Sequence, residues 1–130
     1  MPFMNSTLRS ETVERTQRPW GWYESVPSVS SHIEGIKLKR IGVLPGQQIS
    51  LQKHQHRREH WVVLQGVARV TLDDEIFDLQ PGQHCDIAIG QVHRLANQTD
   101  ALVEILEVQI GDYLSEDDII RLQDDYGRIL

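Results

Sequence analysis

The sequence lacks the features that mark secreted, membrane-spanning and nucleic-acid-binding proteins. Cys85 is its single cysteine, which excludes an intrachain disulfide and favours a cytoplasmic protein. We interpret this cysteine as a packed apolar side chain rather than a catalytic thiol. The N-terminal stretch MPFMNSTLRSETVERTQR contains no long apolar run, so we expect neither a signal peptide nor a membrane span. The net charge of −6 disfavours nucleic acid and anionic membranes, because both require basic surface on their partners.

Glycine-rich nucleotide loops, internal repeats and low-complexity stretches are also missing from the sequence. Its 130 residues are enough for one domain with a buried core. Residues 1–17 are polar and have no periodicity, so we expect a flexible arm followed by a folded domain over residues 18–130. The aromatic segment at residues 18–24 predicts a strap across that domain. We interpret its two tryptophans and Trp61 as core or strap residues, with stacking against a sugar as the alternative.

From Ile36 onward, short alternating segments are separated by turn signals such as Pro45-Gly46 and Pro81-Gly82. This pattern predicts strands at residues 36–43, 49–56, 59–66, 67–73, 75–79, 84–89, 92–97 and 101–111. Many short strands at close spacing are typical of an all-β sandwich or barrel. The last segment, SEDDIIRLQDDYGR, predicts a short helix, with Ser115 as its N-cap and Gly127 as its stop.

Potential metal ligands concentrate in the apolar stretch over residues 46–66. Gln52 and His54 are two residues apart on a predicted strand, so both face one side. Glu59 follows a tight turn onto the next strand and faces the same side, and His93 on a later strand offers a fourth donor. Two imidazoles, a carboxylate and an amide oxygen suit a divalent cation such as Zn²⁺, Mn²⁺, Fe²⁺ or Co²⁺. Mutual hydrogen bonds among these polar side chains are the alternative.

Three further residues are candidates for catalysis or substrate binding. His56 shares the face of the predicted ligands and is a candidate fifth donor, acid/base or rim residue. Lys39 has the parity of the core-facing residues on its strand, and a lysine that points into a barrel requires an anion. Arg57 at the rim is a second anion-binding candidate, with a solvated surface charge as the alternative for both. Basic residues gathered in an acidic chain suit a small anionic ligand. His60 faces away from this set, and we expect it on the outer face.

Two spacings identify a family resemblance. The spacing of Gly46, Gln52, His54, Glu59 and Gly66 resembles the first cupin motif. The spacing of Gly82, Gly90, His93 and Asn97 resembles the second cupin motif. The segments SLQKHQHRREHW, EVQIGDYLSEDDI and YGR further resemble the isomerase domain of type II mannose-6-phosphate isomerases. Those domains are usually the C-terminal half of bifunctional mannose-1-phosphate guanylyltransferase/mannose-6-phosphate isomerases. The resemblance covers residues 18–128 and implies a double-stranded β-helix, or jelly-roll, barrel whose metal set is Gln52, His54, Glu59 and His93.

The resemblance implies a stand-alone, metal-dependent isomerase that interconverts mannose 6-phosphate and fructose 6-phosphate. Zn²⁺ is the expected ion, with Co, Mn, Fe or Ni as alternatives. His56 is the expected base, and Lys39 and Arg57 are expected to hold the phosphate of this small phosphorylated sugar. No nucleotidyltransferase half accompanies the segment, so guanylyl transfer is not expected.

Departures from the family pattern keep two other functions open. Gln55, Arg58, Cys85 and Ala88 differ from the residues common at those positions. The alternatives are a non-catalytic sugar-phosphate-binding cupin and another metal-dependent cupin enzyme, such as an oxygenase. A homodimer is expected, because the aromatic strap and the strand edges require cover.

Overall fold

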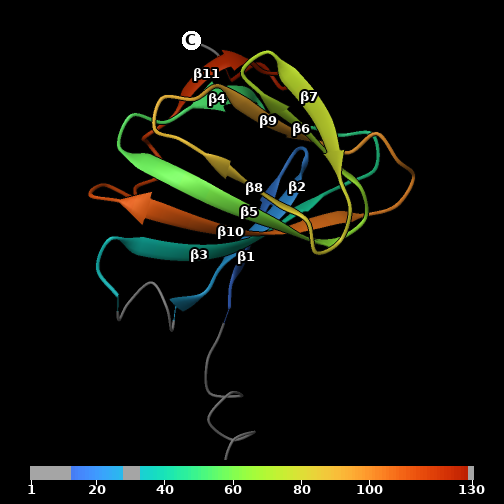
Figure 1. The fold of residues 1–130 in the computed structure, drawn as a ribbon. Coiled ribbons are helices and arrows are strands. Elements are labelled where there is room, and N and C mark those ends of the chain that lie inside the picture. Colours follow the sequence, from blue (N-terminus) through green and yellow to red (C-terminus); the bar gives the residue numbers. More distant parts are fainter. Residues whose placement is uncertain (1–12, 28–32, 129–130) are drawn as a thin grey trace, which may run out of the picture.

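Two facing antiparallel sheets form the protein (Figure 1). The structure is a computed structural model that describes residues 13–27 and 33–128. Its strands are β1 (Arg15–Arg18), β2 (Gly21–Ser25), β3 (Ile36–Val43), β4 (Leu51–Lys53), β5 (Arg57–Gln65), β6 (Ala68–Leu72), β7 (Glu75–Leu79), β8 (His84–Ile87), β9 (His93–Ala96), β10 (Val103–Gly111) and β11 (Ile120–Gln123). One sheet has the order β1-β2-β3-β10-β5-β8 and the other the order β11-β4-β9-β6-β7. The predicted all-β barrel is therefore confirmed.

Strand β10 shows how the interior is divided. It lies between β3 and β5 in the six-stranded sheet, and its alternate residues Val103, Ile105, Glu107 and Gln109 are all buried. Around the first two pack apolar side chains of both sheets, including Val43, Val63, Val70 and Leu95. Glu107 and Gln109 line a cavity instead. The barrel therefore has an apolar core at one end of β10 and a polar chamber at the other.

The predicted aromatic strap is a hairpin that extends the six-stranded sheet. Strand β2 pairs with β3, and Trp20 and Trp22 are buried. Trp22 faces Gly42 across the two strands, where an added Cβ would lie 2.2 Å from the indole ring. The guanidinium of Arg15 lies 3.7 Å from the centroid of that ring. Strand β1 thus begins inside the predicted arm, whose residues 1–12 lie outside the described residues.

The helix predicted for SEDDIIRLQDDYGR is wrong. Ile120–Gln123 form β11, which pairs with β4 at the edge of the five-stranded sheet. The carboxylate of Asp118, in the first turn of the predicted helix, accepts the backbone N–H groups of Gln55 and His56, each at 2.9 Å. Adjacent β-branched residues, Ile119 and Ile120, also favour extended backbone. Tertiary hydrogen bonds therefore outweigh the local helix signals.

The turn predicted between the strands at residues 49–56 and 59–66 is also misplaced. The strand predicted over residues 49–56 is limited to β4, the chain bends at Gln55 and His56, and β5 already begins at Arg57. Arg57 and Glu59 consequently lie on one strand with the same parity, and both are buried. His56 is left on an exposed bend.

Cys85 fits its interpretation as a packed side chain. It lies on β8, partly buried against the core cluster. Burial, assisted by the negative charges of Asp86 and Glu59, raises the pKa of its thiol to about 11. Such a thiol is almost entirely protonated at neutral pH and is a poor nucleophile.

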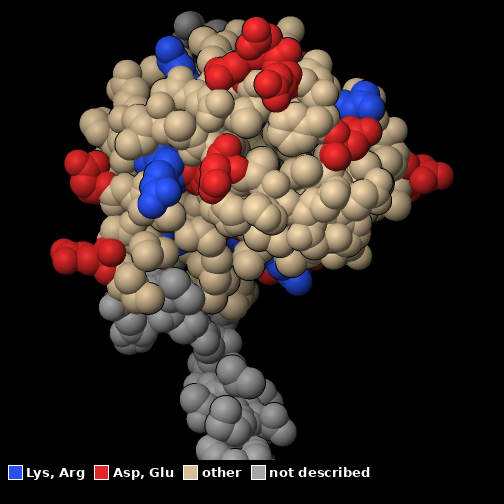
Figure 2. All heavy atoms as spheres, viewed as in Figure 1, with Lys and Arg blue, Asp and Glu red and all other residues tan. Residues whose placement is uncertain are grey.

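The described segments contain no helix that is long and apolar enough to cross a membrane. On the face shown in Figure 2, Lys and Arg side chains lie apart from one another, and acidic side chains lie between them. The homodimer expected from the sequence stays a prediction.

The turn after β11 is held by an ion pair. Arg128 donates from its guanidinium to both carboxylate oxygens of Asp124 at 2.8 Å, and the side chain of Asp124 has 0% exposure. These hydrogen bonds hold the pKa of Asp124 at about 2, against an ordinary value of 3.8. A carboxyl with a depressed pKa in the folded state stabilises the fold above its unfolded pKa, and this stability is lost as the pH falls towards the folded pKa.

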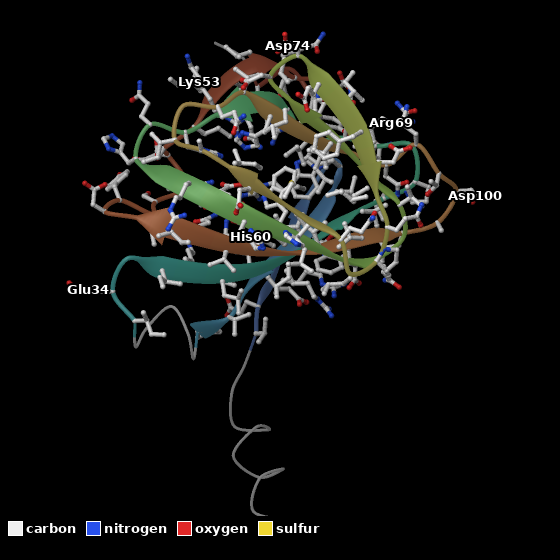
Figure 3. All side chains as sticks on the ribbon, in the orientation of Figure 1. Glu34, Lys53, His60, Arg69, Asp74 and Asp100 are labelled. Atoms are coloured by element: carbon white, nitrogen blue, oxygen red, sulfur yellow. The ribbon has the colours of Figure 1, made fainter. Side chains whose placement is uncertain are left out.

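We expect Asp124→Asn to lower the free energy of unfolding by about 1 kcal/mol at pH 7, because the pair is partly accessible to solvent. The difference from wild type should shrink between about pH 4 and pH 2, where wild type loses the same charge. Urea unfolding at pH 7, 5 and 3 measures it. Asp100→Asn, at a loop tip (Figure 3), is the matched control. A difference that stays constant down to pH 3 would contradict the assignment.

Candidate metal centre

Three buried side chains meet between the sheets: His54 just after β4, Glu59 on β5 and His93 on β9. Their potential ligand atoms all lie within 4.8 Å of one another. Nε2 of His54 is 3.1 Å from one oxygen of Glu59, and Nε2 of His93 is 3.8 Å from the other. The two sheets thus bring together three of the four residues predicted as metal ligands.

Backbone carbonyls orient both imidazoles. Nδ1 of His54 donates to the carbonyl oxygen of Asp118 at 2.6 Å, and Nδ1 of His93 donates to that of Gln91 at 2.9 Å. Each ring therefore turns its Nε2 towards Glu59, the arrangement that metal-binding histidines adopt. Nε2 of His93 has no hydrogen-bond partner within the described part of the chain. Burial lowers the pKa of His93, which keeps the ring in the neutral form that binds a metal ion.

Glu59 is the anionic centre of the site. Burial alone would raise its pKa, but hydrogen bonds with His54 and Glu107 hold the pKa well below its ordinary value. Nε of Arg57 donates to one carboxylate oxygen at 2.9 Å, and Nε1 of Trp61 donates to the other at 3.0 Å. The carboxylate is therefore both charged and fixed in orientation.

Gln52, the fourth predicted ligand, lies on the same side of the sheet as His93. The two residues are direct partners in the β4–β9 ladder, and direct partners in an antiparallel ladder project to the same face. The side chain of Gln52 lines the cavity at the site, and Oγ of Ser50 lies 3.5 Å from its Oε1. Its role as a metal ligand stays a prediction.

A cavity of about 230 Å³ adjoins the triad. Figure 3 shows side chains of both sheets turned into the space between the sheets. The polar and charged residues around the cavity include Lys39, Arg57, Glu107, Gln109 and Arg121. The site thus offers carboxylate, amide and cationic groups beside the two imidazoles.

The three predicted catalytic residues occupy different environments in the structure. Lys39 is buried, as its parity predicted, with Nζ 2.6 Å from a carboxylate oxygen of Glu116 and 4.2 Å from the centroid of the Tyr23 ring. Arg57 lines the cavity, but its guanidinium is committed to Glu59. His56 lies outside the residues that line the cavity, on its exposed bend. Its role as the base stays a prediction without positional support.

Sequence reasoning missed two buried residues on β10. Glu107 and Gln109 follow the alternation of Val103 and Ile105, so the period of two in this strand was the signal that could have found them. Burial, together with the negative charge of Glu59 and a hydrogen bond to it, raises the pKa of Glu107 well above its ordinary value. The pKa of Glu107 is thus raised, whereas that of its neighbour Glu59 is lowered.

Sequence reasoning also missed Arg18 and Arg121. Both line the cavity, together with Arg128. The predicted helix hid Arg121, which on β11 pairs with Gln52 and so faces the same side as that residue. His60, in contrast, lies on the outer face as expected, with Nδ1 2.6 Å from a carboxylate oxygen of Asp86.

Comparison with known proteins identifies the family. A family model described as "Mannose-6-phosphate isomerase C-terminal" matches residues 5–124. The chain belongs to this family. It is 50% identical over 122 residues to alginate biosynthesis protein AlgA of Pseudomonas aeruginosa, a match that covers 92% of this chain and 24% of that protein. It is 44% identical over 127 residues to xanthan biosynthesis protein XanB of Xanthomonas campestris, covering 96% and 26%. The chain thus spans about a quarter of the length of these curated relatives.

The cupin fold is shown by solved structures of lower sequence identity. Oxalate decarboxylase from Bacillus subtilis superposes with a TM-score of 0.74 at 22% identity, over 85% of this chain and 30% of that one. The predicted cupin barrel is therefore confirmed, without the C-terminal helix. Another structure of the same decarboxylase, with a TM-score of 0.71, is described by its Mn(II) centres. The buried triad His54, Glu59 and His93 of the present chain is consistent with a divalent metal site in a cupin.

We expect the triad to bind one divalent ion, and Glu59→Gln or His93→Ala to weaken its binding at least about 100-fold, because each substitution removes a ligand. Equilibrium dialysis against Zn²⁺ and Co²⁺, with elemental analysis, measures the affinity and stoichiometry. His60→Ala is the matched control, because that histidine lies on the same strand as Glu59 and on the outer face. Equal metal content in all four proteins would exclude the triad as the site.

Proposed function

We propose that this domain is a metal-dependent isomerase that interconverts mannose 6-phosphate and fructose 6-phosphate. The observation that carries the proposal is the buried His54–Glu59–His93 triad beside a polar cavity, in a chain that belongs to the mannose-6-phosphate isomerase C-terminal family. The relatives' biosynthetic names concern whole proteins about four times as long. The proposal therefore concerns the chemistry of this domain alone.

His54, Glu59 and His93 would hold the metal ion, with Gln52 as a fourth ligand. Two imidazoles, one carboxylate and an amide suit Zn²⁺ first, and Co²⁺ or Mn²⁺ as alternatives. The bound ion would act as a Lewis acid towards the carbonyl and hydroxyl oxygens of the substrate. Arg57 would keep Glu59 ionised and oriented for this role.

Three arginines at the cavity provide the best support for a phosphate site. Arg128 is neutralised by Asp124, and Arg18 donates to the hydroxyl of Tyr23 at 3.4 Å. Arg121 has a buried Nε with no partner among residues 13–27 and 33–128. Burial and the positive charges of Arg128 and Arg18 lower its pKa. A bound phosphate would satisfy that nitrogen and offset the repulsion. We therefore assign the phosphate to Arg121 rather than to the two cations predicted from the sequence, Lys39 and Arg57.

Aldose–ketose isomerisation moves a proton between C1 and C2 of the sugar. Besides Glu59, the acidic side chains that line the cavity are Glu107 and Glu116, and Glu116 is paired with Lys39, whereas His56 lies on the surface bend. By position we assign the proton transfer to Glu107, with the ammonium of Lys39, its direct partner in the β3–β10 ladder, on the same face.

Incubation of the metal-loaded chain with mannose 6-phosphate should yield fructose 6-phosphate. A coupled enzymatic assay measures the fructose 6-phosphate formed. Glu107→Gln should lower kcat at least about 100-fold while metal content is retained, because general acid–base groups contribute about 10²–10⁴ to rate. His56→Ala discriminates between the two assignments of the base. Loss of activity in His56→Ala, with activity kept in Glu107→Gln, would show that His56 and not Glu107 is the base. Absence of conversion with Zn²⁺, Co²⁺ and Mn²⁺ alike would overturn the proposed function.

Arg121→Gln should raise KM for mannose 6-phosphate about 10-fold or more, because a charge-assisted hydrogen bond to phosphate is worth about 1.5–3 kcal/mol. Inhibition by inorganic phosphate should weaken in parallel, and metal content should not change. Arg69→Gln is the matched control, since that arginine lies at the surface (Figure 3) and pairs with Asp78. An unchanged KM in Arg121→Gln would show that Arg121 does not bind the phosphate.

A further inference from the structure

Gln109 stands apart from the other polar groups of the interior. Its side chain has 0% exposure, and neither Oε1 nor Nε2 has a hydrogen-bond partner among the described residues. Buried amides are almost always hydrogen-bonded, because an unpaired one loses its hydration without compensation. Gln109 also lines the cavity at the metal triad, so a ligand in that cavity is a candidate partner for its unpaired amide.

The position of Gln109 places its amide next to the triad. In the β10–β5 ladder its direct partner is Glu59, and such partners have Cβ atoms about 4.5–5.5 Å apart on one face of the sheet. In the opposite sheet, Gln52 is the direct partner of His93. Each sheet therefore sets a glutamine beside a residue of the triad. They differ in that Gln52 has Ser50 as a neighbour at 3.5 Å, whereas the amide of Gln109 has no hydrogen-bond partner in the described part of the chain.

The chemistry of the amide selects the kind of ligand group. An amide presents one acceptor and two donor hydrogens and carries no charge, so it suits a neutral hydroxyl, which both donates and accepts. A phosphate would use only the donor side and would leave Oε1 unpaired. Arg121, on β11 of the other sheet, is the group suited to the anion. The two residues thus present neutral and cationic hydrogen-bonding groups from opposite sheets.

We propose that Gln109 is a specificity residue that binds a hydroxyl of the sugar at C1 or C2, beside the metal triad. This inference rests on the proposed function, because it takes the ligand to be a phosphorylated sugar whose reacting end lies at the triad. Oε1 accepts from the hydroxyl while Nε2 donates to a hydroxyl oxygen. A ligand that lacks this hydroxyl leaves the buried amide unpaired and binds more weakly.

The test compares wild type with Gln109→Met, which keeps the side-chain length and removes the amide. Both proteins, loaded with Zn²⁺, are titrated calorimetrically with four probes: mannose 6-phosphate, 2-deoxyglucose 6-phosphate, 1,5-anhydromannitol 6-phosphate and inorganic phosphate. We expect wild type to bind at least one of the two deoxygenated analogues about 10-fold more weakly than mannose 6-phosphate. In Gln109→Met that ratio should fall to about 2 or less, while affinity for phosphate and metal content stay at the wild-type level.

Thermal unfolding separates this role from a merely structural one. Removal of an unpaired buried amide should leave the Tm of the ligand-free protein unchanged or raise it, whereas loss of a structural hydrogen bond would lower it. Gln109→Leu, which also lacks the amide, provides a second variant if Gln109→Met fails to fold, and it should likewise lose the discrimination, because a leucine side chain can neither accept from nor donate to a hydroxyl.

Three outcomes would overturn the inference. The first is an unchanged ratio between mannose 6-phosphate and both analogues in the two variants. The second is loss of the metal ion in Gln109→Met, which would make Gln109 a metal ligand. The third is wild-type protein that binds neither sugar phosphate nor analogue, which overturns the proposed function as well. Binding by wild type without conversion to fructose 6-phosphate overturns the isomerase activity alone.

Discussion

A carboxylate buried between two sheets is the constraint on which the site depends. Glu59 is 3% exposed, and an isolated charge at such depth is strongly unfavourable. The surrounding groups compensate for it. Arg57 and Trp61 donate to its two oxygens from the same strand, and His54 approaches from the chain that precedes that strand. Removal of any of these donors would leave the negative charge less compensated, so the geometry of the triad and the stability of the interior are linked.

The segment after β10 completes this arrangement. Asp118 accepts the backbone N–H groups of the bend at Gln55 and His56, and its carbonyl holds the ring of His54. Glu116 pairs with the buried ammonium of Lys39, and the positive charge of Lys39 holds the pKa of Glu116 down against the effect of burial. One irregular stretch thus sets the orientation of a triad imidazole and closes one wall of the cavity. The same contacts explain why it is not a helix, because the carboxylate and the carbonyl of Asp118 bond to other segments.

The sequence was most informative where one periodicity was decisive. The alternation in IKLKRIGV predicted both β3 and the inward direction of Lys39, and the spacing of His54, Glu59 and His93 predicted three residues that meet in the structure. It failed where long-range pairing decides. Local signals at residues 115–128 favour a helix, but pairing of β11 with β4 overrides them, and this hid Arg121. The misplaced turn at residues 57–58 had a similar cause, since a side chain from residue 118 fixes the bend two residues earlier. A pattern within one segment contains no information on such partners.

The charges around the cavity restrict what it can hold. Arg57 is paired with Glu59, Lys39 with Glu116 and Arg128 with Asp124, while Glu107 lies beside Glu59 with a raised pKa. Arg121 therefore lacks a carboxylate partner among the described residues that line the cavity, and Gln109 contributes an unpaired neutral amide. A ligand with one anionic group and several neutral hydroxyls complements such a surface. A small dicarboxylate would place its second charge against the amide, where nothing offsets the cost of its desolvation. Under the proposed function, the distribution of paired and unpaired groups is itself a source of selectivity for a sugar phosphate over other anions of similar size.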